Sequence, residues 1–180
     1  EQTPVEGRHD LIFPLFEFEM HGGMDALIEM EKELLTHLGY DTTKFVKGTY
    51  AEMSEKYGVK ELEHEHETAM ATDMSPTFFL TDFPEYTSPF WNMKRHDAPR
   101  EDIAKKVDVI LSGQETFGSA ERETDREVMR ERFNTISEGG YKQKLYDLFG
   151  QERTDKEMED YLKFDFFERA GGGIGVTRLI

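Results

Sequence analysis

The segment from Leu11 to Met20, with the sequence LIFPLFEFEM, is the feature that most restricts how this chain can fold. Its apolar residues alternate, and alternation predicts a β-strand because successive side chains of a strand point to opposite faces. Phe16, Phe18 and Met20 share one face, whereas the other face carries Phe13, Leu15, Glu17 and Glu19. Two carboxylates beside an aromatic ring do not suit a hydrophobic core. We therefore expect that the second face of this strand is not part of the core.

An amphipathic helix is expected directly after this strand. His21-Gly22-Gly23 breaks the strand, apolar residues then recur at helical spacing over residues 24–38, and Gly39 is a stop signal. Residues 41–75 are expected to be partly helical. Further elements are predicted as strands at 77–80, 90–93 and 107–111, a loop at 82–89, and helices at 121–133, 141–149 and 154–161, the last with Thr154 and Glu157 as a capping box. This order favours an α+β fold, an antiparallel β-sheet flanked by helices.

Composition excludes several classes of protein. The 180 residues include 38 Asp and Glu against 22 Lys and Arg, a net charge of −16, and 12% are aromatic. The aromatic content argues against a disordered chain. The acidity argues against a non-specific nucleic-acid binder, whose affinity comes from basic side chains on phosphates. No run approaches the ~20 apolar residues of a membrane span, so no membrane association is expected. The absence of Cys excludes disulfides, thiolate metal sites and cysteine nucleophiles.

The run GGGIGVTR, at residues 171–178, is a candidate phosphate-binding segment. Glycines allow a backbone to approach a ligand closely, and the guanidinium of Arg178 could hold a phosphate through several donors. The alternative is a glycine-rich turn ahead of a buried helix. The run is not a Walker loop, because no Lys-Ser or Lys-Thr pair follows it, and it lacks the βαβ context of a dinucleotide-binding fingerprint.

A second candidate lies in VDVILSGQETFGSAERE, at residues 107–123. Asp108 is expected on the opposite strand face from Val107 and Val109, and Glu115 and Arg122 follow. Carboxylates near a phosphate-binding Arg suit Mg²⁺, which uses one or two carboxylates together with nucleotide oxygens. The alternative is a solvated strand end. His64 and His66 favour no metal site, because their spacing places them about 200° apart on a helix.

Taken in order, these segments resemble the catalytic core of the class II aminoacyl-tRNA synthetases, in the aspartyl, asparaginyl and lysyl subgroup. Arg8-His9 and the strand after it resemble the second half of motif 2. The stretch FLTDFPEYTSPFWNMKR resembles the subgroup's F-x-T-x-YP…PFYM segment, and residues 107–123 resemble its G-E-I-x-G-G-S-Q-R-E block. GGGIGVTRL resembles motif 3, G-x-G-x-G-x-[DE]-R-L. The resemblance implies an antiparallel sheet with flanking helices, and a homodimer in the full-length protein.

The resemblance also implies roles for individual residues. Phe13 would stack on adenine, and Glu17 would bind the ammonium group of the amino acid. Arg122 would pair with the side-chain carboxylate of aspartate. Glu115 would bind Mg²⁺ and ATP, with Asp108 nearby as a second metal residue. The remaining ATP contacts would come from Arg8, His9, Gly173, Gly175 and Arg178, the last on the γ-phosphate.

Departures from the synthetase pattern are similar to those of archaeal asparagine synthetase, a relative built on the aspartyl core without an anticodon-binding domain. They are Ile12, Ser88, Thr177 and the pair Glu168-Arg169, where synthetases usually carry Glu, Lys, an acidic residue and Pro-His. This resemblance implies a ligase that activates aspartate with ATP and Mg²⁺ as an acyl-adenylate. Ammonia would then attack to give asparagine, AMP and pyrophosphate. The alternative is an aspartyl- or asparaginyl-tRNA synthetase core, with tRNA as a partner.

The chain is expected to be one partial catalytic domain, running from the end of motif 2 to motif 3 across residues 1–180. Motif 1 and the leading Arg of motif 2 would precede Glu1, so we expect the isolated chain to be inactive or very weak. The start of the chain has no signal-peptide pattern, which makes a cytoplasmic location the default expectation.

Overall fold

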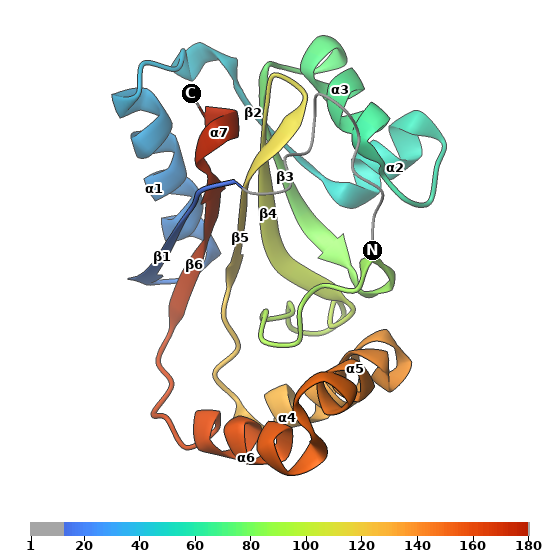
Figure 1. Cartoon of the computed structure of the whole chain (residues 1–180). Helices are drawn as coiled ribbons and strands as arrows, with labels where there is room; N and C mark the ends of the chain where they lie inside the picture. The colour runs from blue at the N-terminus through green and yellow to red at the C-terminus, as the bar shows by residue number, and fades with distance from the viewer. Residues whose placement is uncertain (1–12, 180) are drawn as a thin grey trace.

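The computed structural model describes residues 13–179, and its centre is a six-stranded β-sheet (Figure 1). The strands lie in the order β1-β6-β5-β4-β3-β2, and every neighbouring pair is antiparallel except β2 and β3. Their bounds are β1 Leu15–His21, β2 Phe45–Thr49, β3 Thr77–Pro84, β4 Ile103–Leu111, β5 Gln114–Glu121 and β6 Arg169–Gly175. The predicted α+β class, with an antiparallel sheet flanked by helices, is confirmed.

The helices form three groups, and two of these groups cover the sheet (Figure 1). Helix α1 packs on one face, where its Leu27 and Leu35 join Val107, Val109 and Phe117 in a buried core. Helices α2 and α3 pack on the other face against β3 and β4. Helices α4, α5 and α6 form a separate layer around Trp91. The bounds are α1 Met24–His37, α2 Tyr50–Tyr57, α3 His64–Asp73, α4 Arg126–Thr135, α5 Gly140–Phe149, α6 Gln151–Tyr161 and α7 Val176–Leu179.

Several predicted elements are confirmed with shifted ends. The predicted strand at 11–20 corresponds to β1, although Leu11 and Ile12 lie outside the described residues. The predicted helix at 24–38 corresponds to α1, followed by Gly39 in a left-handed conformation with φ of 92°. The predicted strands at 77–80 and 107–111 are the first half of β3 and the second half of β4, and the helix at 141–149 is α5.

Other predictions are wrong. Residues 90–93 form a turn with one isolated bridge from Met93 to Arg122, because the backbone there wraps around the Arg95 guanidinium instead of pairing in the sheet. Part of the predicted loop at 82–89 continues β3 as far as Pro84. The predicted capping box at Thr154 fails, because α6 starts at Gln151 and the Thr154 hydroxyl donates back to the carbonyl of Gly150.

Three strands were not predicted: β2, β5 and the glycine-rich β6. β2 lies within the polar stretch 41–75, and its alternating pattern is too short to stand out. β5 follows the two-residue turn of Ser112 and Gly113, both with positive φ, and joins β4 in a hairpin. The predicted helix at 121–133 consequently starts later, at Arg126, because residues up to Glu121 belong to β5. Within residues 13–179, no helix is long and apolar enough to cross a membrane.

Candidate active site

A cleft of about 670 Å³ opens over β1, β6 and β5, on the face of the sheet opposite α1. Glycines of β6 form much of its floor, and acidic and basic side chains of the neighbouring strands form its walls. The predicted residues that line it are Phe13, Glu17, Glu115, Arg122, Gly173, Gly175 and Arg178. Seven residues that are scattered over 166 positions of the sequence are therefore gathered in one place, whereas Arg8 and His9 lie outside the described residues.

The run GGGIGVTR, for which a glycine-rich turn was the alternative interpretation, forms the end of strand β6 and the start of helix α7. The strand explains the shape of the cleft floor. β6 lies between β1 and β5, with Gly173 paired to Glu17 on one side and to Gly118 on the other. At Gly172, a Cβ atom would come within 2.2 Å of the Ser119 hydroxyl and 2.5 Å of the Gly118 carbonyl. Glycine is thus a packing requirement at this strand position, because the neighbouring strand leaves no room for a side chain.

A bulge in the β4–β5 hairpin brings two carboxylates to one face. Val109 pairs with Phe117 and Ile110 pairs with Glu115, so Thr116 is an extra residue in β5. An extra residue reverses the facing of the strand beyond it. Phe117 accordingly points to the α1 core, whereas Glu115 shares the cleft face with Asp108, which is paired with Gly118. A Cβ at Gly118 would lie 3.0 Å from Oε1 of Glu115 and 3.7 Å from Oδ1 of Asp108.

Asp108 lies beneath the cleft rather than in its wall, and it is only 7% exposed. Its Oδ2 forms an ion pair with Nζ of Lys106, whereas its Oδ1 is buried without a hydrogen-bond partner. Burial raises the pKa of Asp108 to about 7, with Lys106 opposing that rise and Glu115 adding to it. An orphaned carboxylate oxygen next to a second carboxylate fits a divalent cation, and Mg²⁺ needs no more than these two when phosphates supply other ligands. Between Phe13 and Leu179, no group of three or more acidic, His or Cys side chains is arranged so that it could hold a metal ion.

Glu115 is fixed at its backbone from two directions. Its N–H donates to Oε2 of Glu67, from α3, at 3.1 Å. Its carbonyl oxygen accepts a hydrogen bond from Nη1 of Arg178, in α7, at 2.5 Å. The hairpin is also seated on α3 through Gly113, where a Cβ would lie 2.9 Å from the Cα of Thr68. Two candidate ligand-binding residues, Glu115 and Arg178, are therefore held together by the fold itself.

Arg122 lies at the far end of β5 and forms an ion pair with Glu19 of β1, with 2.9 Å between Nε and Oε1. Arg169 approaches the other oxygen of Glu19 at 3.6 Å. The Glu19 carboxylate is therefore already bound to the Arg122 guanidinium, which was predicted to bind a substrate carboxylate. Because half of the Glu19 side chain is exposed to solvent, an incoming carboxylate would have to displace or share this partner.

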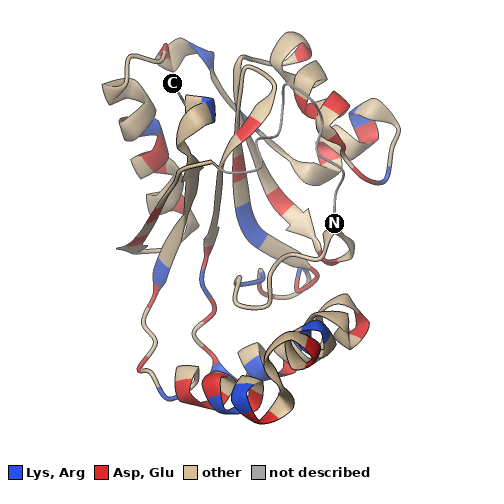
Figure 2. Cartoon of the chain, viewed as in Figure 1, with Lys and Arg blue, Asp and Glu red and all other residues tan. Residues whose placement is uncertain are grey.

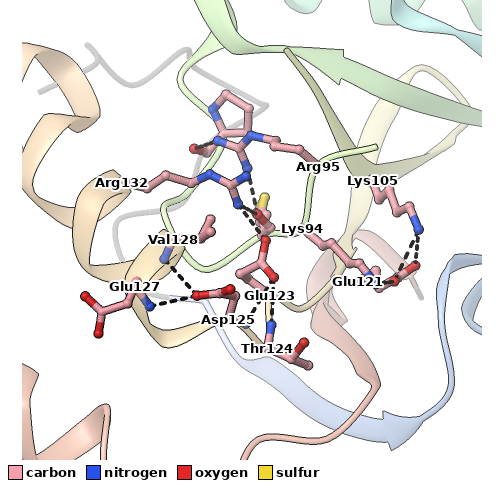
Figure 3. Close-up of polar contacts among 12 residues, drawn as sticks. Lys94, Arg95, Lys105, Glu121, Glu123, Thr124, Asp125, Glu127, Val128 and Arg132 are labelled. Atoms are coloured by element: carbon pink, nitrogen blue, oxygen red, sulfur yellow. Dashed lines mark hydrogen bonds and ion pairs between the residues drawn. The ribbon is translucent and has the colours of Figure 1, made fainter. Parts of the chain in front are cut away.

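Glu121 and Glu123, the residues on either side of Arg122, are both held by ion pairs (Figure 3). Glu121 is buried on the α1 side, where Lys94 at 2.9 Å and Lys105 at 3.2 Å pair with it. It also accepts a hydrogen bond from the N–H of Met24, at the start of α1. Glu123 pairs with Arg132 of α4 at 2.9 Å. These anchors on both neighbours direct the Arg122 side chain toward the cleft.

The sequence did not single out Lys106 or Glu67 as residues of this region. It also did not reveal that Glu19 pairs with Arg122. Lys106 could have been noticed, because it lies two residues before Asp108 and a strand places such residues on the same face. Glu67 could not have been noticed, because its contact with the N–H of Glu115 depends on how α3 packs on the β4–β5 hairpin. His66, near it, serves the start of α3, where its Nδ1 accepts from the N–H of Glu63 at 2.8 Å.

Comparisons with known proteins support the family and the fold. The sequence matches the profile of the tRNA synthetases class II (D, K and N) over residues 7–180. No curated protein sequence gives a significant match. Similar solved structures include the aspartyl-tRNA synthetase of Entamoeba histolytica, with a TM-score of 0.74 and 20% identity over 99% of this chain and 41% of that one.

Two asparaginyl-tRNA synthetases solved with asparaginyl-adenylate are also similar. The Entamoeba histolytica protein has a TM-score of 0.78 and 16% identity, covering 99% of this chain and 46% of that one. The Pyrococcus horikoshii protein has a TM-score of 0.70 and 18% identity, covering 96% and 44%. The chain thus spans less than half the length of these proteins, and the likeness at such low identity concerns the fold. Because the family profile covers nearly the whole sequence, the chain belongs to the class II tRNA synthetases of the D, K and N group.

Proposed function

We propose that this chain forms part of a site that activates aspartate with ATP, and that ammonia accepts the activated aspartyl group to give asparagine. The observation that carries the proposal is the convergence of Glu17, Glu115, Arg122 and Arg178 on one cleft with a glycine floor. The full-length protein would be an AMP-forming ligase and a homodimer. Two of the similar structures contain asparaginyl-adenylate, which is the same class of intermediate.

In this proposal the cleft residues divide between the two substrates. Phe13, at the entrance of β1, would stack on adenine, and Arg178 would hold the γ-phosphate, with Arg8 and His9 as further phosphate ligands. Glu17 would hold the α-ammonium group of aspartate. Arg122 would hold the α-carboxylate in exchange for Glu19, because the side-chain carboxylate, which the resemblance assigns to Arg122, is the group activated in asparagine synthesis. The glycines at 173 and 175 leave space for ligand atoms close to the backbone.

Asp108 and Glu115 would hold Mg²⁺, because one buried oxygen of Asp108 lacks a partner and the Glu115 carboxylate lies beside it. The cation would supply positive charge to the phosphates of ATP. The side-chain carboxylate of aspartate attacks the α-phosphorus and pyrophosphate leaves, because only activation of this carboxylate leads to asparagine. Arg178 offsets charge on the triphosphate during this step, and Glu17 and Arg122 keep aspartate oriented.

Ammonia would then attack the acyl carbon of the aspartyl-adenylate. A C–N bond forms, the bond between the acyl carbon and AMP breaks, and the nitrogen loses a proton. The acidic surface supports ammonia rather than tRNA as acceptor, because binding of a nucleic acid requires basic area. Acidic and basic residues alternate over α4–α6 (Figure 2). Many of the basic residues are tied in ion pairs, among them Arg130 with Glu127 and Glu159, and Lys156 with Asp160.

The second candidate is the catalytic core of an aspartyl- or asparaginyl-tRNA synthetase. The family match and the similar structures favour it as strongly, since the solved proteins are tRNA synthetases. Both candidates form an acyl-adenylate from ATP and an amino acid. They differ in the acceptor and in the carboxylate that is activated, which is the α-carboxylate for tRNA charging and the side-chain carboxylate for asparagine synthesis.

Product analysis of the full-length protein separates the two. The protein is incubated with aspartate, ATP and Mg²⁺, and either ammonium or total tRNA is added. The proposal predicts free asparagine and AMP with ammonium alone, and no acid-precipitable aminoacyl-tRNA. Aminoacyl-tRNA without free asparagine would reject ammonia as the acceptor and establish the second candidate.

A further inference from the structure

Lys106 is a charged residue at the cation site that neither the sequence patterns nor the proposed mechanism has used. It lies on β4 two residues before Asp108, so both side chains project from the same face of the sheet. Its Nζ forms an ion pair with Oδ2 of Asp108, and the two side chains are only 19% and 10% exposed. An ion pair so far removed from solvent is screened much less than a surface pair.

The position of the Lys106 ammonium is fixed by a third group. Nζ lies 3.7 Å from the centre of the Phe83 ring, and Phe83 is itself buried in the core under α2 and α3. A cation over an aromatic face is attracted by the ring, more strongly when water is excluded. Across the sheet, Lys106 pairs with Ala120, whose small side chain offers no alternative partner. The ammonium is therefore held beside Asp108.

The other oxygen of Asp108 is the one that a divalent cation would use. Its Oδ1 is buried without a partner, and Oε1 of Glu115 approaches the same point above Gly118. Two carboxylates and one ammonium leave a net charge of −1 at the site. A divalent ion that binds there is attracted less strongly than it would be by two unpaired carboxylates, because Lys106 repels the ion and already pairs with Oδ2 of Asp108.

We propose that Lys106 is a positioning residue that acts as a built-in monovalent cation in the metal site and weakens divalent-ion binding when no nucleotide is present. Its ammonium group pairs with Oδ2 of Asp108, so Oδ1 of Asp108 and the carboxylate of Glu115 are the groups that remain to bind the metal. Phosphate oxygens must then supply the remaining attraction, so the metal binds together with ATP rather than ahead of it. This inference rests on the proposed ATP and Mg²⁺ site.

Mn²⁺ binding to the full-length protein without nucleotide, followed by the electron paramagnetic resonance signal of free Mn²⁺, tests the proposal. Lys106→Met removes the charge and keeps a flexible apolar chain against Phe83. We expect it to lower the Mn²⁺ dissociation constant by about tenfold or more, because a nearby positive charge is lost. Lys105→Met is the matched control. Lys105 is next to Lys106 in the sequence, but it pairs with Glu121 on the other face of the sheet, so this variant should leave Mn²⁺ binding unchanged.

Two more variants complete the test. Lys106→Gln also removes the charge but can still donate to Oδ2, and it replaces Lys106→Met if that variant does not fold. Adding Asp108→Asn to either variant should abolish the gain, which locates the bound Mn²⁺. Unchanged or weaker Mn²⁺ binding in a folded Lys106 variant would overturn the proposal, as would a gain that survives Asp108→Asn.

A parallel titration with a non-hydrolysable ATP analogue distinguishes failure of this inference from failure of the proposed function. If the wild-type protein binds no ATP analogue, the proposed function is wrong and the inference falls with it. If it binds the analogue and the Lys106 variants show no gain in Mn²⁺ affinity, only the role of Lys106 is wrong.

Discussion

The Arg178 guanidinium donates a hydrogen bond to the backbone carbonyl of Glu115, with 2.5 Å between Nη1 and the oxygen. The two residues are 63 positions apart, yet this contact joins the first turn of α7 to the bulged end of β5. A proposed phosphate ligand and a proposed metal ligand are thus set at a fixed separation before any substrate binds. Such preorganisation lets charged groups act on a transition state without rearranging.

Arg178→Ala in the full-length protein should therefore reduce adenylate formation strongly. It removes both a phosphate ligand and the support of Glu115, and we expect kcat/KM for ATP to fall about 100-fold or more. Steady-state kinetics of AMP formation check this. Arg153→Ala, on the exposed surface of α6, is the control and should behave like the wild type. Equal activity of the two variants would show that Arg178 does not bind ATP.

The Glu67 carboxylate is expected to tune the metal site through the backbone, since its Oε2 accepts from the N–H of Glu115. Glu67→Ala should raise the Mg²⁺ concentration needed for half-maximal activity by about tenfold, the range typical of residues that orient metal ligands. A Mg²⁺ titration at saturating ATP measures the effect. Glu65→Ala, on an exposed position of the same helix, should not shift the titration.

Gly172 should tolerate no side chain, because a Cβ there would overlap the Ser119 hydroxyl and the Gly118 carbonyl. We expect Gly172→Ala to lower the free energy of unfolding by about 1–3 kcal/mol, which is the usual cost of overpacking. Gly175→Ala is the matched control in the same strand, since its Cβ would meet no atom closer than 3.6 Å. Thermal unfolding of both variants tests this, and a Gly175→Ala that melts as low as Gly172→Ala would contradict it.

Glu31 is a buried carboxyl of α1 whose two oxygens have no hydrogen-bond partner among residues 13–179. Burial raises its pKa from 4.5 to about 8, so the folded protein keeps the proton that the unfolded chain releases. This group therefore lowers the free energy of unfolding as the pH rises from 4.5 toward 8. Glu31→Gln should remove that loss.

Denaturant unfolding at a series of pH values measures the effect of Glu31→Gln. The variant should gain stability relative to the wild type as the pH rises through this window and show no further gain above it. Glu33→Gln, at an exposed position of the same helix, is the control and should track the wild type at every pH. A constant difference between Glu31→Gln and the wild type would mean that Glu31 is ionised in the folded protein.

The sequence predicted the fold class and most cleft residues because strong local patterns carry them. Alternation marks β1, and helical spacing marks α1. Other features depend on contacts between distant segments. The bulge at Thr116 turns Glu115 onto the face of Asp108, and no alternation pattern within 107–123 contains that information. Glycines 171–173 read as a turn, although close packing between β1 and β5 makes them a strand.

Residues 90–93 show the opposite error, because they were predicted as a strand and form a turn. Phe90, Trp91 and Met93 have the β-propensity of a strand, but Trp91 packs edge-on against Phe133 and Tyr161 in the helical layer. Burial against α4 and α6 overrides the local preference. The pairing of Arg122 with Glu19 was likewise invisible in the sequence, because 103 positions separate the two residues.

The central claim is that the cleft activates aspartate with ATP, and aspartate-dependent exchange of labelled pyrophosphate into ATP tests it most directly. The full-length protein should catalyse this exchange with aspartate and Mg²⁺, without ammonium or tRNA, and Arg178→Ala should abolish it. Exchange that is absent for the wild type, or that proceeds without any amino acid, would contradict the account.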